Sequence, residues 1–420
     1  MHLQMLCFAR FIYCDFYSQS SKIIGSFYFT RMSTSVKLVS KVIVNIENEG
    51  QKRVSHTNID DNTAPEAKII KVDSERIKRK PYAIMLGYLG KDYYGMQRNP
   101  GMKTIEEDLI NSLFRANLIT QEAFDCIQTI NFQRAARTDK GVSACRQIVS
   151  LKLPEPINIK QLNYYLPEEI RIFGAKRVTK GFNSKNKCDA RTYLYIIPTY
   201  AFVQNSFISN DDFTDEQKIE NLSIINGKPC TEYRISEEKL DTLKRIMKLF
   251  EGSHNFHNFT YKVKPLDPSA RRYIIEFSIS DVFLNDNVEF AVLKIKGQSF
   301  MLHQIRKMVG LVIGILRSMV SEDVMQEVFQ LNKFEIPMAP SLGLVLNYVH
   351  YDNYNKRYGN DGMHEKLEWK ECEAEVDEFF KNSILNYIIK TELSEKQILN
   401  WIMNVEENYT FKIEEKAKSN

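Results

Sequence analysis

The stretch RAARTDKGVSA begins at residue 134 and places one carboxylate, that of Asp139, close to two cations, Arg137 and Lys140. Gly141 follows, and a Lys-Gly pair favours a turn because glycine adopts backbone angles that other residues avoid. Neighbouring cations favour the ionised form of a carboxyl group. An ionised carboxylate in a loop can act as a nucleophile, a general base or a metal ligand, or it can simply cap a turn. The stretch by itself leaves these roles open.

Hydrophobic patterns on both sides of this loop predict the elements that hold it. Period-2 alternation predicts strands, apolar residues spaced three and four apart predict helices, and Thr104 with Glu107 has the pattern of a capping box. The predicted strands cover 82–90, 126–134, 146–153, 170–178, 191–199, 273–281, 288–297 and 342–352, and the predicted helices cover 103–116, 158–166, 236–250, 300–319 and 372–390. Two successive blocks that mix helices with several strands indicate an α+β fold with two related lobes.

Shifts in composition divide the chain into four predicted parts. Residues 1–80 form a polar extension, mostly disordered or targeting, and 81–187 form an N-terminal lobe that bears the Asp139 loop. Residues 188–355 form a C-terminal lobe. Within it, residues 205–235 are expected to form an insertion on the protein surface. Residues 356–420 form a helical tail.

Overall composition limits the classes of function. The net charge is only +4, so a nucleic-acid surface has to come from local basic clusters rather than from a global field. The 25 Phe and 21 Tyr can stack on bases as well as fill a core. The seven cysteines are scattered without a CxxC pair, which favours reduced thiols in an intracellular protein and argues against a structural zinc knot.

The N-terminal extension contains two candidate targeting signals. Residues 1–31 are aromatic, with a single acid, which is typical of a mitochondrial presequence; the alternative is an untranslated or disordered leader, because Met32 is a plausible second start. The basic run ERIKRKP at 75–81 fits a nuclear-import signal, a phosphate-contacting arm or a plain solvated linker. We predict a nuclear location, with the mitochondrion as the alternative.

The predicted helix 300–319 is apolar, but its charged residues argue against a membrane span. Arg306 lies at the margin of its core stripe, where a guanidinium can enter a half-buried cleft or extend to water. His303 lies one turn earlier. His254 and His257 precede the helix, and satisfaction of backbone groups in a turn is the favoured explanation for both, over a metal site.

Six stretches, in order, resemble one family. AARTDKGVSA is similar to the signature of the TruA-type tRNA pseudouridine synthases, and the other matches are GYLGKDYYGMQRNPGMKTIEEDL, CDARTYLYIIPT, EGSHNFHNFT, FMLHQIRKMVG and APSLGLVL. They cover about 82 to 351. Details such as YYGMQRN and HNFHNFT resemble the eukaryotic multi-site branch, nuclear or mitochondrial. One departure is Cys145-Arg146, where the family has small residues, and we expect it to alter RNA contacts beside the loop.

The resemblance implies a fold and a set of roles. The fold is the pseudouridine synthase fold, two ferredoxin-like lobes with antiparallel sheets around a central RNA-binding cleft. Asp139 would be the nucleophile, Tyr193 the base-stacking tyrosine and proton acceptor, and Arg306 the partner of the carboxylate. The residues implied to bind the substrate are Arg137, Leu344, His303, Tyr94, Gln97 and Arg98.

The reaction that this implies is the isomerisation of uridine to pseudouridine at several tRNA positions around the anticodon stem-loop. It involves no redox change and no group donor, so we expect no cofactor and no metal. Small nuclear RNA and mRNA stay open as further substrates. We expect no membrane partner and, because the tail can block a pairing surface, a monomer.

Two other functions compete with this one. The chain could be a tRNA-binding chaperone on a synthase scaffold whose catalysis is dispensable. It could also be a hydrolase or phosphatase with an Asp nucleophile, but that chemistry needs an acidic metal cluster, and none is visible in the sequence near Asp139.

Overall fold

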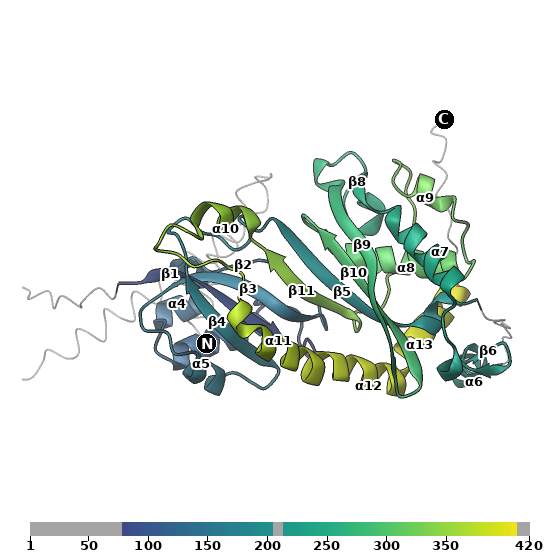
Figure 1. The fold of residues 1–420 in the computed structure, drawn as a ribbon, viewed down its shortest axis with the longest axis horizontal. Helices are drawn as coiled ribbons and strands as arrows, with labels where there is room; N and C mark the ends of the chain where they lie inside the picture. The colour runs from purple at the N-terminus through teal and green to yellow at the C-terminus, as the bar shows by residue number, and fades with distance from the viewer. Residues whose placement is uncertain (1–77, 205–212, 410–420) are drawn as a thin grey trace, which may run out of the picture. The chain divides into compact units, whose positions relative to one another are not determined.

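One nine-stranded sheet organises the part of the chain that the computed structural model describes, residues 78–204 and 213–409 (Figure 1). The predictions for residues 1–77 therefore lie outside the described residues. The strands of the sheet are β1 Lys80–Tyr88, β2 Gln133–Arg134, β3 Ser143–Leu153, β4 Ile170–Arg177, β5 Ala190–Pro198, β8 Gly252–Asn255, β9 Arg271–Asn285, β10 Val288–Gly297 and β11 Leu344–His350. A separate ribbon pairs β6 Ile224–Ile225 with β7 Lys228–Pro229.

The order of the strands is β4-β1-β3-β11-β5-β10-β9-β8, with β2 paired to β3. The pairings are antiparallel except for β11 with β3, where Val345 lies opposite Ser143. The last strand in the sequence thus lies in the middle of the sheet and joins its two halves (Figure 1). The predicted α+β class is confirmed, and the two predicted lobes share one continuous sheet. The boundary proposed for them, between 187 and 188, stays a prediction.

Helices pack on this sheet with capped ends. Thr104, Asn158, Thr214 and Ser236 each accept a backbone N–H at a helix N-terminus. The α-helices are α3 Ile105–Arg115, α4 Gln121–Asp125, α5 Ile159–Tyr165, α6 Asp215–Leu222, α7 Glu237–Lys248, α8 Gln304–Leu316, α9 Val324–Glu327, α10 Asp352–Tyr358, α11 Glu373–Phe379, α12 Asn386–Glu395 and α13 Gln397–Asn408. Shorter 3-10 turns are η2 Ile127–Ile130, η3 Thr199–Phe202, η4 Cys230–Glu232, η5 His257–Phe259, η6 Pro268–Ala270 and η7 Lys370–Cys372, and η8 Phe380–Leu385 is π-helical. Within the described ranges, no helix has both the length and the apolar character to cross a membrane.

Helix α8 is shorter than the predicted helix 300–319. His303 has φ +65°, a left-handed conformation that cannot continue a right-handed helix, so the helix begins at Gln304. Its far end is at Leu316. A Cβ atom added to Gly310 would lie 2.1 Å from the carbonyl oxygen of Pro337. The absence of a side chain at Gly310 therefore lets α8 approach the backbone of the 337–339 segment.

The predicted strand 126–134 is wrong, and the capping box is only half formed. Residues 127–130 form η2, which ends at Asn131 in a left-handed conformation with φ +55°, and only Gln133–Arg134 pair as a strand. At α3, Thr104 accepts the N–H of Glu107, but the carboxylate of Glu107 pairs with Arg98 instead of returning to the cap. A stronger ionic partner thus replaces the second bond of the box.

The tail helices run from the β3–β4 half of the sheet toward α6 (Figure 1). They continue to Asn408, beyond the predicted stretch 372–390. Arg146, which the sequence suggested as an altered RNA contact beside the loop, is instead buried; its Nη2 lies 2.7 Å from Glu373 of α11. At the other end Arg317 lies 2.8 Å from Glu406 of α13. The tail is therefore tied to strand β3 at one end and to the end of α8 at the other.

Candidate active site

The backbone before Asp139 is held by side chains from two strands. Gln147 on β3 is fully buried; its Nε2 donates to the carbonyl of Ala136 at 2.8 Å, and its Oε1 accepts the N–H of Ala136 at 3.2 Å. Arg191 on β5 donates to the carbonyl of Ala135 through Nη2 at 2.6 Å and Nε at 3.0 Å. Because these bonds satisfy the polar groups of an irregular segment, the loop has one defined path.

A second loop packs against the first. The N–H of Met96 donates to the carbonyl of Thr138 at 3.1 Å, and the hydroxyls of Tyr88 and Thr138 lie 2.8 Å apart. Gly95 has φ +94°, and a Cβ there would lie 2.7 Å from the carbonyl oxygen of Thr138. Only glycine therefore allows this close approach, and the segment 94–98 is fixed beside the nucleophile candidate.

Asp139 is partly buried and lies near His303 and Arg306. Its side chain is 23% exposed, and its Oδ2 lies 3.9 Å from Nε2 of His303. Burial raises the pKa of Asp139, and the charges of His303 and Arg306 oppose that rise. The carboxylate thus stands in a place where ionisation costs free energy, which is typical of a functional site.

Arg306 reaches the site from the first turns of α8. Its Nε donates to the carbonyl of Ala339 at 2.7 Å, and the N–H of Ala339 donates back to the carbonyl of Arg306 at 3.1 Å. Burial lowers the pKa of Arg306, while the nearby groups of Tyr195 and Asp139 raise it. Its guanidinium is fixed through one edge, so its remaining N–H groups are oriented rather than free to rotate.

Tyr193 and Leu344 supply apolar surface. Tyr193 lies on β5, is 7% exposed, and packs edge-to-face on Phe300 with ring centroids 5.3 Å apart. Burial raises the pKa of Tyr193, and the charge of Asp139 raises it further. Leu344 opens β11 and is 6% exposed. A Cβ at Gly141 would lie 3.2 Å from the hydroxyl of Ser341, so the segment before β11 lies against the Asp139 loop.

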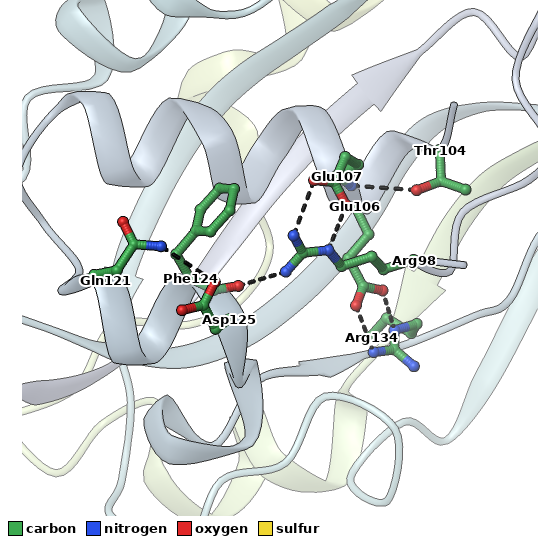
Figure 2. Close-up of polar contacts among 8 residues, drawn as sticks. All are labelled: Arg98, Thr104, Glu106, Glu107, Gln121, Phe124, Asp125 and Arg134. Atoms are coloured by element: carbon green, nitrogen blue, oxygen red, sulfur yellow. Dashed lines mark hydrogen bonds and ion pairs between the residues drawn. The ribbon is translucent and has the colours of Figure 1, made fainter. Parts of the chain in front are cut away.

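The four other predicted substrate-binding residues have different surroundings. Arg137 and Tyr94 are exposed, and Nζ of Lys140 lies 4.3 Å from the centre of the Tyr94 ring. Gln97 is half-buried. Arg98 is committed elsewhere, because its guanidinium pairs with Glu107 and donates to the carbonyl of Phe124 (Figure 2).

Figure 2 shows Arg98 within a larger paired cluster. Glu106, which is 1% exposed, lies 2.8 Å from Nε of Arg134, and a second bond of 3.0 Å joins the same two side chains. Burial raises the pKa of Glu106, and Arg134 opposes the rise. Since Arg134 opens the stretch that leads to Asp139, this cluster anchors the start of the catalytic loop to α3.

Sequence reasoning missed the side chains that hold the loop. Arg191 stands in the matched stretch CDARTYLYIIPT, two residues before Tyr193, and that proximity was the available signal. Gln147 is an internal polar residue of a strand whose other β3 positions up to Leu151 are buried, and a buried amide needs a partner. For the two turn histidines the prediction is confirmed: His254 and His257 each bond a backbone carbonyl, those of Glu251 at 2.8 Å and Asn332 at 3.1 Å.

Comparison with known proteins identifies the class. A family model described as tRNA pseudouridine synthase matches residues 246–352. The chain belongs to the TruA-type tRNA pseudouridine synthase family, and it is an enzyme of the isomerase class. Its sheet is consistent with the fold of that family, as the sequence predicted.

The relatives that establish this membership are eukaryotic. The chain is 46% identical to Pseudouridylate synthase 1 homolog of Homo sapiens over 324 residues, which are 76% of this chain and 71% of the relative. It is 44% identical to Pseudouridylate synthase 1 homolog of Mus musculus, with coverage of 78% and 74%. It is 34% identical to tRNA pseudouridine synthase 1 of Yarrowia lipolytica, with coverage of 70% and 68%.

Proposed function

We propose that this chain isomerises uridine to pseudouridine at several positions of tRNA, around the anticodon stem-loop, with Asp139 as the nucleophile. The observation that carries the proposal is the state of Asp139: a partly buried carboxylate on a fixed loop, near His303 and Arg306 but hydrogen-bonded to neither. A nucleophile has to be ionised and still available, and this arrangement supports both conditions.

The reaction breaks the bond between N1 of the base and C1′ of the sugar and forms a bond between C5 and C1′. Asp139 adds either to the ring or to the sugar carbon. Arg306 stabilises the charge that moves during the step. The target base has to leave its stack, which costs on the order of a few kcal/mol. In this proposal the Tyr193 ring and Leu344 compensate as an aromatic platform and an aliphatic wall.

Contacts outside the pocket hold the RNA. The exposed guanidinium of Arg137 and the Lys140–Tyr94 pair suit phosphates and an unstacked base, and Gln97 lies on the same loop as Tyr94. We propose that Arg98 acts on the structure of this loop rather than on RNA. We also propose a monomer located in the nucleus, or alternatively in the mitochondrion, that acts on tRNA and also on small nuclear RNA or mRNA.

The test is a pseudouridine map of all RNA from cells with and without the protein, including mitochondrial tRNA, together with purified wild type and Asp139→Ala on single tRNAs. We expect pseudouridine at several anticodon-arm positions with wild type and none with the variant. If wild type forms none on any tRNA, the proposal is wrong. If the variant keeps full tRNA-folding activity in cells that need the protein, the chaperone function becomes the main one.

A further inference from the structure

Formation of pseudouridine requires one proton to move, and the proposed function does not assign the group that moves it. Once C5 is joined to C1′, it still carries its hydrogen. That proton has to leave, and N1, which has lost the sugar, has to gain one. The resemblance gives the accepting role to Tyr193. The structure also offers a second candidate beside the nucleophile, the imidazole of His303.

His303 is held at the site by an unusual backbone. Its φ of +65° is a left-handed conformation, which is unfavourable for a non-glycine residue. Neighbouring bonds keep it there: its carbonyl accepts the N–H of Lys307 at 3.0 Å, and the carbonyl of Leu302 accepts the hydroxyl of Thr260 at 2.9 Å. A strained residue fixed by its surroundings next to a reactive carboxylate is a candidate for a direct role.

The position of the imidazole suits contact with substrate. Its side chain is 30% exposed, and its Nε2 lies 3.9 Å from Oδ2 of Asp139, too far for a hydrogen bond and near enough to reach the same bound base. Three charged groups face it: the Asp139 carboxylate from the loop, and Arg306 and Lys307 from α8. Burial and the two cations lower the pKa of His303, and Asp139 opposes them. The imidazole is therefore neutral near pH 7 and has a lone pair available.

Tyr193 is less suited to accept a proton. A phenol becomes an effective base only as the phenolate, and burial raises the pKa of Tyr193 above its ordinary value of 10.0. Its edge-to-face contact with Phe300 makes it a rigid platform. Tyr193 is thus suited to stack on the base, and His303 is suited to exchange protons at neutral pH.

We infer that His303 is a catalytic residue, the general base that removes the proton from C5 of the rearranged base. The C5–H electron pair returns to the ring as the C5–C6 double bond, and the proton passes to the imidazole. The imidazolium then gives a proton to N1, directly or through solvent, so that the product is an isomer of the substrate and no co-reactant is needed. This inference rests on the proposed function.

The test uses full-length protein, single-turnover conditions and a tRNA whose target uridine carries deuterium or hydrogen at C5. With His303→Gln we expect the rate to fall about 100-fold, a typical contribution of a general base, while tRNA binding changes less than about 2-fold. We also expect a larger primary isotope effect than in wild type, because proton removal becomes slower relative to the other steps. His364→Gln is the matched control, since His364 also lies beside a carboxylate, 2.7 Å from Asp361, outside the site.

A second variant covers a possible loss of packing. Glycine accepts a φ of +65° without strain, so His303→Gly keeps the backbone and removes only the imidazole. We expect added imidazole to restore part of its rate in proportion to concentration. The inference is overturned if His303→Gln keeps the wild-type rate, if neither isotope effect nor rescue is seen, or if the larger isotope effect arises in Tyr193→Phe instead. If wild type itself forms no pseudouridine, the proposed function fails and not this assignment alone.

Discussion

Two charged clusters lie on either side of the stretch that leads to Asp139, and they differ in one respect. In the paired cluster of Figure 2, Glu106 meets Arg134 at 2.8 Å and Glu107 meets Arg98, so both carboxylates are in direct contact with a guanidinium. At the site, Asp139 is also partly buried, but His303 lies 3.9 Å away. In the first cluster each carboxylate is in close contact with a guanidinium, whereas the Asp139–His303 pair is wider and has no hydrogen bond.

We interpret this difference as one between charges that stabilise the fold and charges that serve the proposed reaction. A buried ion pair in contact is costly to break, because either partner alone is left desolvated. A buried carboxylate without a hydrogen-bonded counter-charge is already desolvated in the free protein. Reaction with a bound substrate can remove this unfavourable charge. Residues 134–139 connect the two clusters. The ion pair of Glu106 with Arg134 therefore helps to fix the position of Asp139.

The largest expected effect is that of Asp139 on the rate of pseudouridine formation. Asp139→Asn should lower the rate of pseudouridine formation by at least about 1000-fold, because the proposed nucleophile is removed. It should also raise the melting temperature by roughly 1–2 °C. The folded-state pKa of Asp139 is raised, so its contribution to stability is present below its ordinary pKa of 3.8 and is lost as the pH rises through the folded value. A lower melting temperature at pH 7 would contradict this picture of the site.

The paired cluster should respond in the opposite way. Burial raises the pKa of Glu106 as it does that of Asp139, but Glu106 is in direct contact with a buried guanidinium. Glu106→Gln therefore leaves Arg134 buried without its counter-charge, and we expect this loss to outweigh the relief of burying a carboxylate, at about 3 kcal/mol in the free energy of unfolding, measured by urea titration. Turnover of the remaining folded protein should change little. Glu122→Gln, an exposed glutamate on α4, is the control. A large loss of rate without loss of stability would mean that Glu106 belongs to the site.

A third buried carboxylate sharpens the comparison. Glu392 on α12 is 3% exposed and accepts the hydroxyl of Tyr200 at 3.1 Å and the N–H of Ile398 at 3.1 Å. Burial raises the pKa of Glu392 from 4.5 to about 7. Stability from this group is therefore full below about pH 4.5 and is lost as the pH rises through about 7. At about 1.4 kcal/mol for each pH unit, the change amounts to about 3 kcal/mol at most.

Glu392→Gln should remove this pH dependence. We expect the unfolding free energy of the variant, relative to wild type, to rise by about 2–3 kcal/mol between pH 4.5 and pH 8 in urea titrations. Glu378→Gln, an exposed glutamate on α11, should leave the wild-type profile unchanged. If the unfolding free energies of Glu392→Gln and wild type depend on pH in the same way, the pKa of Glu392 is not raised in the folded protein.

The smallest expected effect on stability and tRNA affinity is that of Arg98. The family resemblance implies that Arg98 binds RNA, whereas in the structure it pairs with Glu107. If Arg98 acts through Glu107, then Arg98→Ala and Glu107→Gln should each cost about 1 kcal/mol of stability and should not be additive in the double variant. Both should alter tRNA affinity equally and by less than about 3-fold. A tenfold loss of affinity with Arg98→Ala alone would restore the RNA-binding role that the motif implied.

Local patterns in the sequence predicted much of the scaffold. The apolar spacing of 103–116 and 236–250 and the alternation in 288–297 correspond to α3, α7 and β10, because those elements depend on neighbours in the chain. Motif order also predicted that Asp139, His303 and Arg306 serve one site, and the structure brings these three together.

What could not be predicted depends on contacts between distant residues. Nothing in FMLHQIR signals that His303 is left-handed, since histidine has no preference for that conformation as strong as that of glycine. Arg98 lies at a motif position, yet only the folded chain shows that Glu107 and the carbonyl of Phe124 occupy it. The place of β11 between β3 and β5 likewise follows from pairing between segments that lie far apart in the chain, as Val345 with Ser143 and Leu344 with Tyr195.

The late position of β11 in the chain has a consequence for synthesis on the ribosome. Strands β3 and β5 emerge long before residues 344–350 are translated, so the edges that β11 later covers stay open in the nascent chain. Until the last strand arrives, the nascent protein consists of two half-sheets with bare edges, the form in which a chain is most prone to aggregate and most in need of a chaperone. Assembly of the surroundings of Asp139 is thus one of the last events of folding.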